Sequence, residues 1–312
     1  MSTLICGSVA YDSIMVFPGR FKDVILPDQV HILNVAFLVP EMRREFGGCA
    51  GNIAYNLRML GGEALPMATV GDDAQPYLER FDALGISRRF VRSVAGSFTA
   101  QAFITTDLDD NQITAFHPGA MSQSHLNAVP GDGSVRLGIV APDGRDGMLQ
   151  HAQQFAERGI PFIFDPGQGL PMFGKQDLAW FIERAHYVAV NDYEARLIVD
   201  KSGQSLENIA RQVEALIVTR GGNGSHIHLR NGEMLDIPVA PVRRLTDPTG
   251  CGDAYRAGLL YGLSKGLDWG TTGRLAATMG AIKIENAGAQ NHIADRSQIA
   301  ERFREAFGYR PW

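Results

Sequence analysis

The sequence predicts an α/β protein whose mostly parallel, doubly wound sheet lies between helices in a three-layer arrangement. Two observations lead to this fold class. Short apolar runs alternate with helical patterns along most of the 312 residues. Two stretches, 13–40 and 97–117, break the alternation, because they are rich in Val, Ile, Phe and Thr and have no helical period. We expect these stretches to form one small discontinuous β lid, on a core made of residues 1–12, 41–96 and 118–312.

The core elements follow in chain order. Strands are expected at residues 4–9, 64–70, 137–140, 160–164, 187–190 and 216–219. Helices are expected at residues 50–60, 75–83, 148–158, 175–185 and 192–199, and another apolar helix begins near residue 253. This βα order predicts parallel strands with helices on both faces of the sheet.

Composition argues for a cytoplasmic enzyme. The formal net charge is −5 and the basic residues are scattered, so no nucleic-acid partner is expected. No apolar run reaches the roughly 18 residues of a membrane span, and the first residues do not resemble a secretion signal. The cysteines are too dispersed for a metal motif or a disulfide framework, and this favours a reducing compartment.

A glycine-rich turn runs into an apolar helix at Gly250-Cys251-Gly252-Asp253. Consecutive backbone N–H groups at a helix start bind anions, and Asp253 beside them could take a proton from a hydroxyl that attacks a phosphate. The motif therefore predicts phosphoryl transfer, although by itself it also fits an ordinary turn. Cys251 is either a reactive thiol, activated by the helix N-terminus, or a small buried residue.

A second glycine motif, Gly47-Gly48, opens a helix that contains Asn52. The glycines allow close approach of a ligand, and Asn52 can donate to and accept from a hydroxyl, although a tight turn before a packed helix would look the same. Together and in this order, the two motifs closely resemble the paired signatures of the ribokinase-like (PfkB) carbohydrate kinase family. The resemblance covers essentially the whole chain and also implies the β lid.

The resemblance implies a sugar pocket. In the family an aspartate after the first strand, here Asp12, holds sugar hydroxyls, and Gly47, Gly48 and Asn52 complete the pocket. Cys49 follows the diglycine where free-sugar kinases often carry Lys, and the chain is similar here to the prokaryotic nucleoside kinase branch, close to adenosine kinase. Three lid or near-lid side chains could then flank a purine, or else fill the core of the lid: Phe103, Phe116 and Met121.

The resemblance also implies an ATP site. Asn191 and Glu194 match the family motif that organises Mg²⁺ through water. Nucleotide contacts are expected at Thr219, Arg220, Gly222 and Gly224, where glycines permit close approach to phosphates, and at Asn286 beside the adenine. A monovalent cation such as K⁺ is implied near Asp247 and Thr249.

The predicted reaction is transfer of phosphate from ATP to the 5′-hydroxyl of a nucleoside, with Asp253 as the base and the amides of residues 250–252 stabilising charge. A kinase for free ribose or fructose, a kinase for a sugar phosphate and a non-catalytic nucleoside sensor remain as alternatives. The retained Asp253 and Glu194 argue against the sensor, which needs no base. A homodimer through the lid is also expected.

Overall fold

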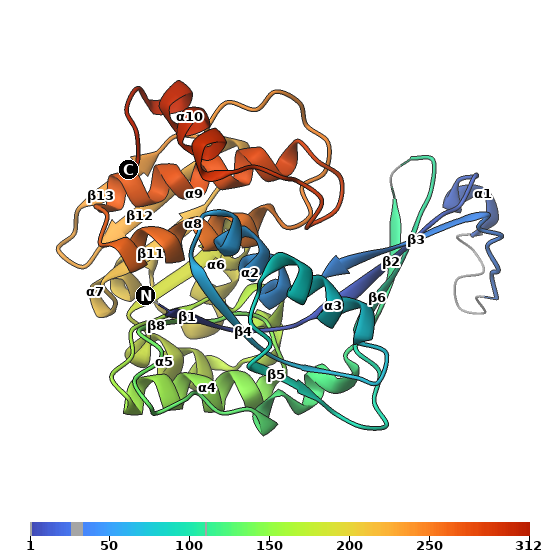
Figure 1. Ribbon diagram of the computed structural model, residues 1–312, viewed down its shortest axis with the longest axis horizontal. Coiled ribbons are helices and arrows are strands. Elements are labelled where there is room, and N and C mark those ends of the chain that lie inside the picture. Colours follow the sequence, from blue (N-terminus) through green and yellow to red (C-terminus); the bar gives the residue numbers. More distant parts are fainter. Residues whose placement is uncertain (1, 26–33, 110) are drawn as a thin grey trace.

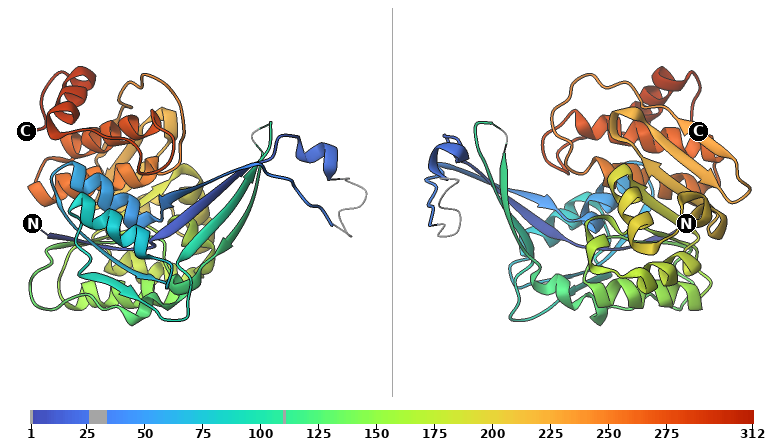
Figure 2. Two further views of the ribbon diagram at one scale, coloured as in Figure 1. Left: turned by 45° about the vertical axis from the view of Figure 1, so that its right-hand side comes forward. Right: turned by 180° about the vertical axis from the view of Figure 1, so that it is seen from behind.

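The protein, described by a computed structural model for residues 2–25, 34–109 and 111–312, contains two sheets (Figure 1). Residues 26–33 and 110, which belong to the predicted lid, lie outside the described residues. The larger sheet forms the body, and the smaller one projects from it (Figure 2).

The larger sheet is mostly parallel, as predicted. Its parallel strands are β1 (Ser2–Cys6), β4 (Glu63–Val70), β5 (Phe90–Ser93), β8 (Leu137–Val140), β9 (Phe162–Phe164), β10 (Tyr187–Asn191) and β11 (Ala215–Thr219). Two antiparallel strands extend one edge, β12 (Ser225–Leu229) and β13 (Met234–Ile237). The order is β13-β12-β11-β10-β9-β8-β1-β4-β5.

Helices cover both faces of this sheet. One layer contains α2 (Cys49–Met59), α3 (Gln75–Leu84), α8 (Cys251–Lys265) and α9 (Trp269–Ile284), with α10 (Arg296–Phe307) beside α9. The other contains α4 (Arg145–Glu157), α5 (Lys175–Arg184), α6 (Asp192–Ser202) and α7 (Leu206–Gln212). Ile5 packs in the first layer, whereas its neighbours Leu4 and Cys6 pack in the second. Because successive strand side chains point to opposite faces, a continuous apolar run suits a sheet buried on both sides, and the predicted fold class is confirmed.

The smaller sheet has four strands in the order β3-β2-β6-β7. They are β2 (Ala10–Val16), β3 (Glu41–Gly47), β6 (Ala100–Thr106) and β7 (Gln112–His117). A short helix, α1 (Phe21–Val24), and three 3₁₀ helices complete the described elements: η2 (Gly119–Leu126), η3 (Gly167–Met172) and η4 (Gly221–Asn223).

The boundaries of the smaller sheet differ from the predicted lid. Residues 10–12 and 41–47 were assigned to the core, but they form strands of the four-stranded sheet. The predicted strand at residues 4–9 in fact ends at Cys6, because the chain turns at Gly7 and Ser8, where the Ser8 N–H donates to the carbonyl of Pro142. A new strand then begins at Ala10, so Asp12 lies within a strand and not in a loop.

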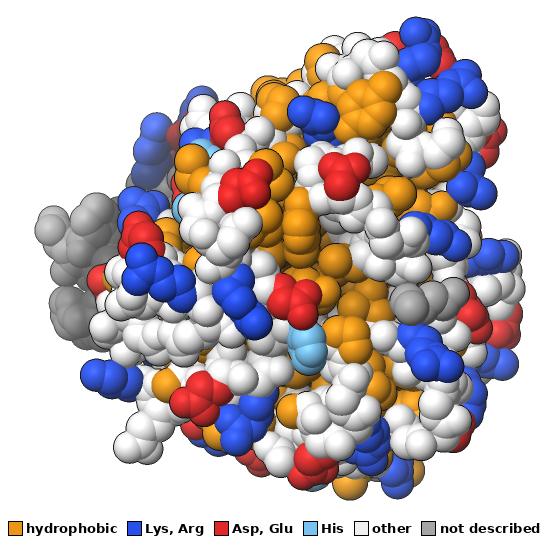
Figure 3. Space-filling view, turned by 90° about the vertical axis from the view of Figure 1, so that its left-hand side faces the viewer, with side chains coloured by type: hydrophobic (Ala, Val, Ile, Leu, Met, Phe, Trp, Pro, Cys, Tyr) orange, Lys and Arg blue, Asp and Glu red, His pale blue; other side chains and the backbone are white. Residues whose placement is uncertain are grey.

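The surface turned away from the four-stranded sheet carries mixed side chains. Figure 3 shows basic and acidic side chains interspersed among apolar ones on this face. Among the helices of the described residues, none is long and apolar enough to span a bilayer.

Candidate active site

Asp253 and Asn52 meet where α2 and α8 pack together. The side-chain amide of Asn52 donates to Oδ2 of Asp253 over 2.8 Å, and Oδ1 of Asn52 accepts from Nε2 of Gln290 at 3.0 Å. The orientation of the Asn52 amide is therefore fixed at both ends. The glycine motifs at the starts of the two helices thus belong to one site, as the sequence predicts.

The environment of Asp253 brings the pKa of its carboxyl group close to neutral pH. Burial raises its pKa to about 7; the hydrogen bond from Asn52 opposes the shift, and the Asp165 carboxylate adds to it. A general base works best when its pKa lies near the working pH. Asp253 is therefore suited to accept a proton from a bound hydroxyl.

An ion pair missed by the sequence analysis lies beside this base. Arg256, one turn after Asp253, donates from Nε and Nη2 to the two carboxylate oxygens of Asp165, each over 3.1 Å, and both residues are buried. Asp165 follows β9 at its carboxyl end. A single arginine within an otherwise apolar helix, and an aspartate directly after a strand, were the signals that could have identified the pair.

The start of α8 leaves room for an anion. Gly250 has φ of 79° and caps the helix, and an added Cβ there would stand 2.9 Å from Cβ of Ala289. Gly252 is exposed, with open space where a side chain would stand. Within the described part of the chain, the N–H groups of Gly250 and Gly252 have no protein acceptor, whereas that of Cys251 donates to the carbonyl of Pro248 over 3.1 Å. Of the three N–H groups predicted to bind an anion, those of Gly250 and Gly252 are therefore available, whereas the Cys251 N–H is used in a hydrogen bond within the turn.

The Cys251 side chain is half-buried. Burial raises the pKa of this thiol to about 11, and its Sγ lies 3.9 Å from the carbonyl oxygen of Asp247. The raised pKa argues against the reactive-thiol interpretation, because the loss of solvation outweighs the charge of Lys283, which lowers the pKa. Cys6, Cys49 and Cys251 are all free thiols.

The diglycine loop brings Asp12 to the same region. Gly48 has φ of 83°, and a Cβ there would lie 2.6 Å from both the Ala10 nitrogen and the Ser8 carbonyl oxygen. A Cβ on Gly47 would lie 2.6 Å from Oδ2 of Asp12. Only glycines allow the loop to pass this close to β2 and the Asp12 carboxylate.

The Asp12 carboxylate lies in a negatively charged environment. Burial raises its pKa to about 6, and Glu45 and Asp247 contribute to the shift. A carboxylate destabilised in this way gains from hydrogen-bond donors such as the hydroxyls of a ribose. The role implied for Asp12 in holding sugar hydroxyls stays a prediction.

The strand register places Phe103 and Phe116, which were expected to flank a purine, on opposite faces of the sheet. Asp12 pairs with Ala102 on β6, and Ala102 pairs with Phe116 on β7, so Asp12 and Phe116 share one face of the sheet. Phe103 pairs with Ser13 and points to the opposite face. The two rings therefore do not enclose a ligand on the Asp12 face together, and only Phe116 can line it. Met121 lies in η2, where its carbonyl oxygen is next to Gly144.

Asn191 and Glu194 form a capping box at the start of α6. Asn191 donates from its N–H and its side-chain amide to the two Glu194 oxygens at 2.8 and 2.9 Å, and its Oδ1 accepts from the Glu194 N–H. Burial and the nearby Asp165 carboxylate raise the pKa of Glu194, whereas the Arg256 guanidinium lowers it. A cation beside Glu194 would favour its ionised form. Among the described residues, no group of three or more His, Cys, Asp or Glu side chains could hold a metal ion.

The predicted nucleotide contacts lie at the carboxyl ends of β10 and β11. Thr219 pairs with Asn191 across the two strands. The Arg220 guanidinium, however, donates to Asp236 on β13 over 2.9 Å, so its charge is already paired outside the predicted phosphate site. Gly222 has open space around it, whereas Gly224 is required by the hairpin, because a Cβ there would lie 2.2 Å from the carbonyl oxygen of Ile237.

The residues implied to bind K⁺ are already engaged by protein groups. The Asp247 carboxylate accepts from the N–H groups of Thr249 and Gly288, each at 2.8 Å. Its carbonyl accepts from the Lys283 ammonium over 2.7 Å, and the Asn286 carbonyl accepts from the same ammonium at 3.0 Å. Since a fixed positive charge already occupies this position, a monovalent cation does not fit beside it. The Asn286 amide donates to the carbonyl of Ile282 at the end of α9.

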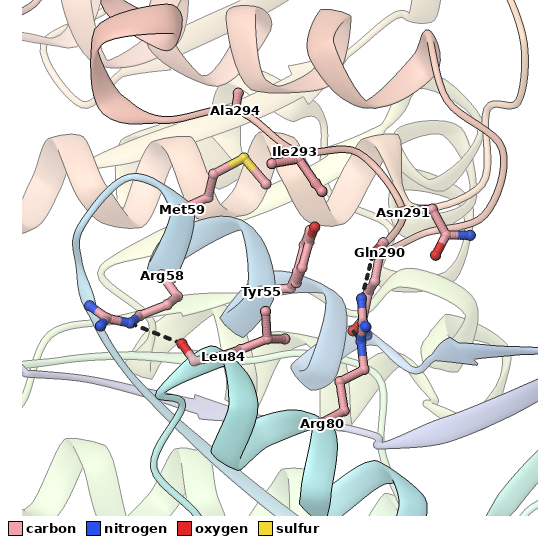
Figure 4. A pocket seen from close by; sticks show the side chains of 9 residues that line it. All are labelled: Tyr55, Arg58, Met59, Arg80, Leu84, Gln290, Asn291, Ile293 and Ala294. Atoms are coloured by element: carbon pink, nitrogen blue, oxygen red, sulfur yellow. Dashed lines mark hydrogen bonds between the residues drawn. The ribbon is translucent and has the colours of Figure 1, made fainter.

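A cavity among the described residues lies next to this site. It measures about 620 Å³ and lies between α2, α3 and the loop after α9 (Figure 4). Arg80 donates to the carbonyl of Gln290 over 2.6 Å on its wall. The cavity does not include Asp253, so we place the chemistry at the start of α8 and not in this cavity.

Comparisons with known proteins identify the family of this chain. The model of the pfkB family carbohydrate kinases matches residues 8–296. The nucleoside kinase of Burkholderia thailandensis in complex with inosine is 57% identical, with a TM-score of 0.90 and 99% of each chain covered. Its complex with ADP-inosine is 59% identical, with a TM-score of 0.88, covering 99% of this chain and 97% of that one. A nucleoside kinase of Methanocaldococcus jannaschii is 29% identical over 277 residues, which are 87% of this chain and 90% of that protein.

A carboxylate base beside an open, glycine-rich helix start is the site of a phosphotransferase. The chain belongs to the PfkB family of carbohydrate kinases, as the match over residues 8–296 shows.

Proposed function

We propose that this protein transfers the γ-phosphoryl group of ATP to the 5′-hydroxyl of a ribonucleoside. The observation that carries the proposal is Asp253, whose pKa is raised to about 7 and whose carboxylate lies at the open start of α8. The likeness to the B. thailandensis nucleoside kinase, which binds inosine, and ADP with inosine, supports a nucleoside as the acceptor and ATP as the donor.

Each residue of the site has one task in this mechanism. Asp253 accepts the proton of the 5′-hydroxyl while that oxygen attacks the γ-phosphorus, and the bond from the γ-phosphorus to the bridging oxygen of ADP breaks. The N–H groups at Gly250 and Gly252 stabilise the charge on the transferred group. Asp12 and Asn52 hold the nucleoside, and the proton on Asp253 is afterwards released to solvent.

Mg²⁺ is proposed as the cofactor, because Glu194 lies at the start of α6, where burial raises the pKa of its carboxyl group and a cation would stabilise the ionised form. When bound with ATP it neutralises phosphate charge, and Glu194 would hold it through water.

A panel of acceptors tests the proposal. Adenosine, inosine and guanosine are each incubated with ATP and Mg²⁺, alongside ribose, fructose and a sugar phosphate, and the product is located by ³¹P NMR. We expect 5′-monophosphates from the nucleosides and a lower kcat/KM for the free sugars. Equal or higher kcat/KM for ribose or fructose would replace the nucleoside with a free sugar, and phosphorylation of the sugar phosphate alone would favour the other alternative.

We also propose a homodimer through the four-stranded sheet. Phe103, Ile113 and Met42 lie on the face opposite Asp12 and are exposed, which is unusual for large apolar side chains in one sheet. Light scattering should give twice the mass of one chain, and Phe103→Glu should reduce it to the mass of one.

A further inference from the structure

A buried lysine lies directly beneath the phosphate-binding turn. Lys283, in the last turn of α9, is 0% exposed. Its ammonium donates to the carbonyl oxygens of Asp247 at 2.7 Å and of Asn286 at 3.0 Å. Lysines are almost never fully buried unless they are paired, so this placement calls for a specific role.

The Lys283 ammonium joins two loops that together hold the start of α8. The first loop, residues 246–250, leads into Gly250. The second, residues 285–289, follows α9. The N–H groups of Thr246 and Asp247 donate to the carbonyl of Ile284, and the Gly288 N–H donates to the Asp247 carboxylate. The cation thus stabilises the base of the turn that presents Gly250 and Gly252 to a phosphate.

The charge of Lys283 is balanced locally. Burial lowers its pKa, and the Asp247 carboxylate opposes that shift. Asp247 in turn is half-buried, and hydrogen bonds from Thr249 and Gly288 together with the charge of Lys283 lower its pKa despite the opposing effect of burial. Burial, together with the charge of Lys283, lowers the pKa of the buried His292 to about 4, so this ring adds no second positive charge at neutral pH. The negative end of the α9 dipole favours a cation here as well.

We propose that Lys283 is a positioning residue that supplies, as a permanent part of the chain, the positive charge that a monovalent cation would bring to this turn. The protein then works without K⁺, in contrast to the expectation from family resemblance. The effects that we expect on kcat rest on the proposed phosphoryl transfer. The effects that we expect on the Tm do not.

The wild-type enzyme provides the first test. Its kcat is measured with ATP, Mg²⁺ and inosine in KCl, NaCl and tetramethylammonium chloride at one ionic strength. We expect the same kcat in all three salts, because the cation position is already filled. A clear activation by K⁺ over tetramethylammonium would overturn the proposal, and this measurement needs no variant.

Two substitutions provide the second test. Lys283→Ala frees the two carbonyls and leaves space, whereas Lys283→Met removes the charge but fills the space. We expect both substitutions to lower kcat by about 10²-fold, because a small displacement of the turn at Gly250 and Gly252 would misalign the reacting groups. Only Lys283→Ala should recover activity in KCl. Lys265→Met, which removes an exposed lysine at the end of α8, is the matched control and should behave as wild type in every salt.

Thermal unfolding without substrate separates this inference from the proposed function. K⁺ should raise the Tm of Lys283→Ala, because a bound ion stabilises the folded state, and should leave wild type and Lys283→Met unchanged relative to Na⁺. A K⁺-independent Tm for Lys283→Ala, together with an unchanged kcat, would make Lys283 a structural residue only. If no nucleoside is phosphorylated, the proposed function fails while the Tm comparison still tests Lys283.

Discussion

Asn52 donates a hydrogen bond of 2.8 Å to Asp253, although the two residues are separated by 201 positions. The bond joins the acceptor side of the site, on α2, to the base on α8. It also lowers the pKa of Asp253 against the effect of burial, so one amide both positions the base and adjusts its ionisation.

Replacing the base should abolish most of the activity. Asp253→Asn keeps the size of the side chain and removes the proton acceptor, so we expect kcat to fall by about 10²–10⁴-fold. Nucleoside affinity, measured by calorimetry, should stay close to that of wild type. Near-normal turnover of the pure variant would remove Asp253 from the role of base.

Activity should depend on pH through the same group. Since the base must be ionised, kcat should decline as the pH falls through about 7, the pKa of Asp253. Asn52→Ala removes a hydrogen bond that lowers this pKa, so the acid limb should move to higher pH. A pH–kcat profile of both proteins checks the direction, and an unchanged limb in Asn52→Ala would contradict it.

Asp12 should matter for the nucleoside and not for ATP. Asp12→Ala removes an ionised acceptor, and the nucleoside should lose about 1.5–3 kcal/mol of binding free energy. ATP affinity serves as the internal control in the same calorimetric series. Loss of affinity for both ligands would indicate a general disturbance of the site.

The register of the four-stranded sheet leads to a paired prediction. Phe116→Ala should raise the KM for nucleosides, because this ring shares the face of Asp12. Phe103→Ala, on the opposite face, is the matched control and should leave KM unchanged; light scattering of this variant checks that the proposed dimer, whose surface includes Phe103, is retained. The reverse pattern would place the nucleoside on the other side of the sheet.

The buried ion pair between Arg256 and Asp165 should affect the stability of the fold more than catalysis. Arg256→Met leaves the Asp165 carboxylate buried without its partner, and we expect a loss of about 3–5 kcal/mol in the free energy of unfolding. The double variant Asp165→Leu/Arg256→Met removes both charges and should recover much of that loss. Urea unfolding of wild type, of each single variant (Arg256→Met and Asp165→Leu) and of the double variant measures this, and simple additivity of the two single losses would argue against coupling.

The sequence by itself determined the larger features of the molecule. Continuous apolar runs such as that at Leu4–Ile5–Cys6 specify strands buried on both faces, because their alternate side chains must each find a helix layer. The glycines at Gly48 and Gly250 mark the starts of α2 and α8, because both adopt positive φ. These signals are local, so pattern and spacing were enough to predict the fold class and the two glycine turns, whereas most other candidate site residues were expected only from the family resemblance.

Tertiary structure decided what depends on contacts between distant residues. Whether Phe103 or Phe116 shares the face of Asp12 is set by strand register, and a shift of one residue would reverse it. The packing of helices and loops determines that Arg256 pairs with Asp165. It also determines that the Lys283 ammonium binds the Asp247 carbonyl. These contacts join residues far apart in the sequence, so no short-range sequence pattern specifies them. They determine the positions of the charged groups in this site.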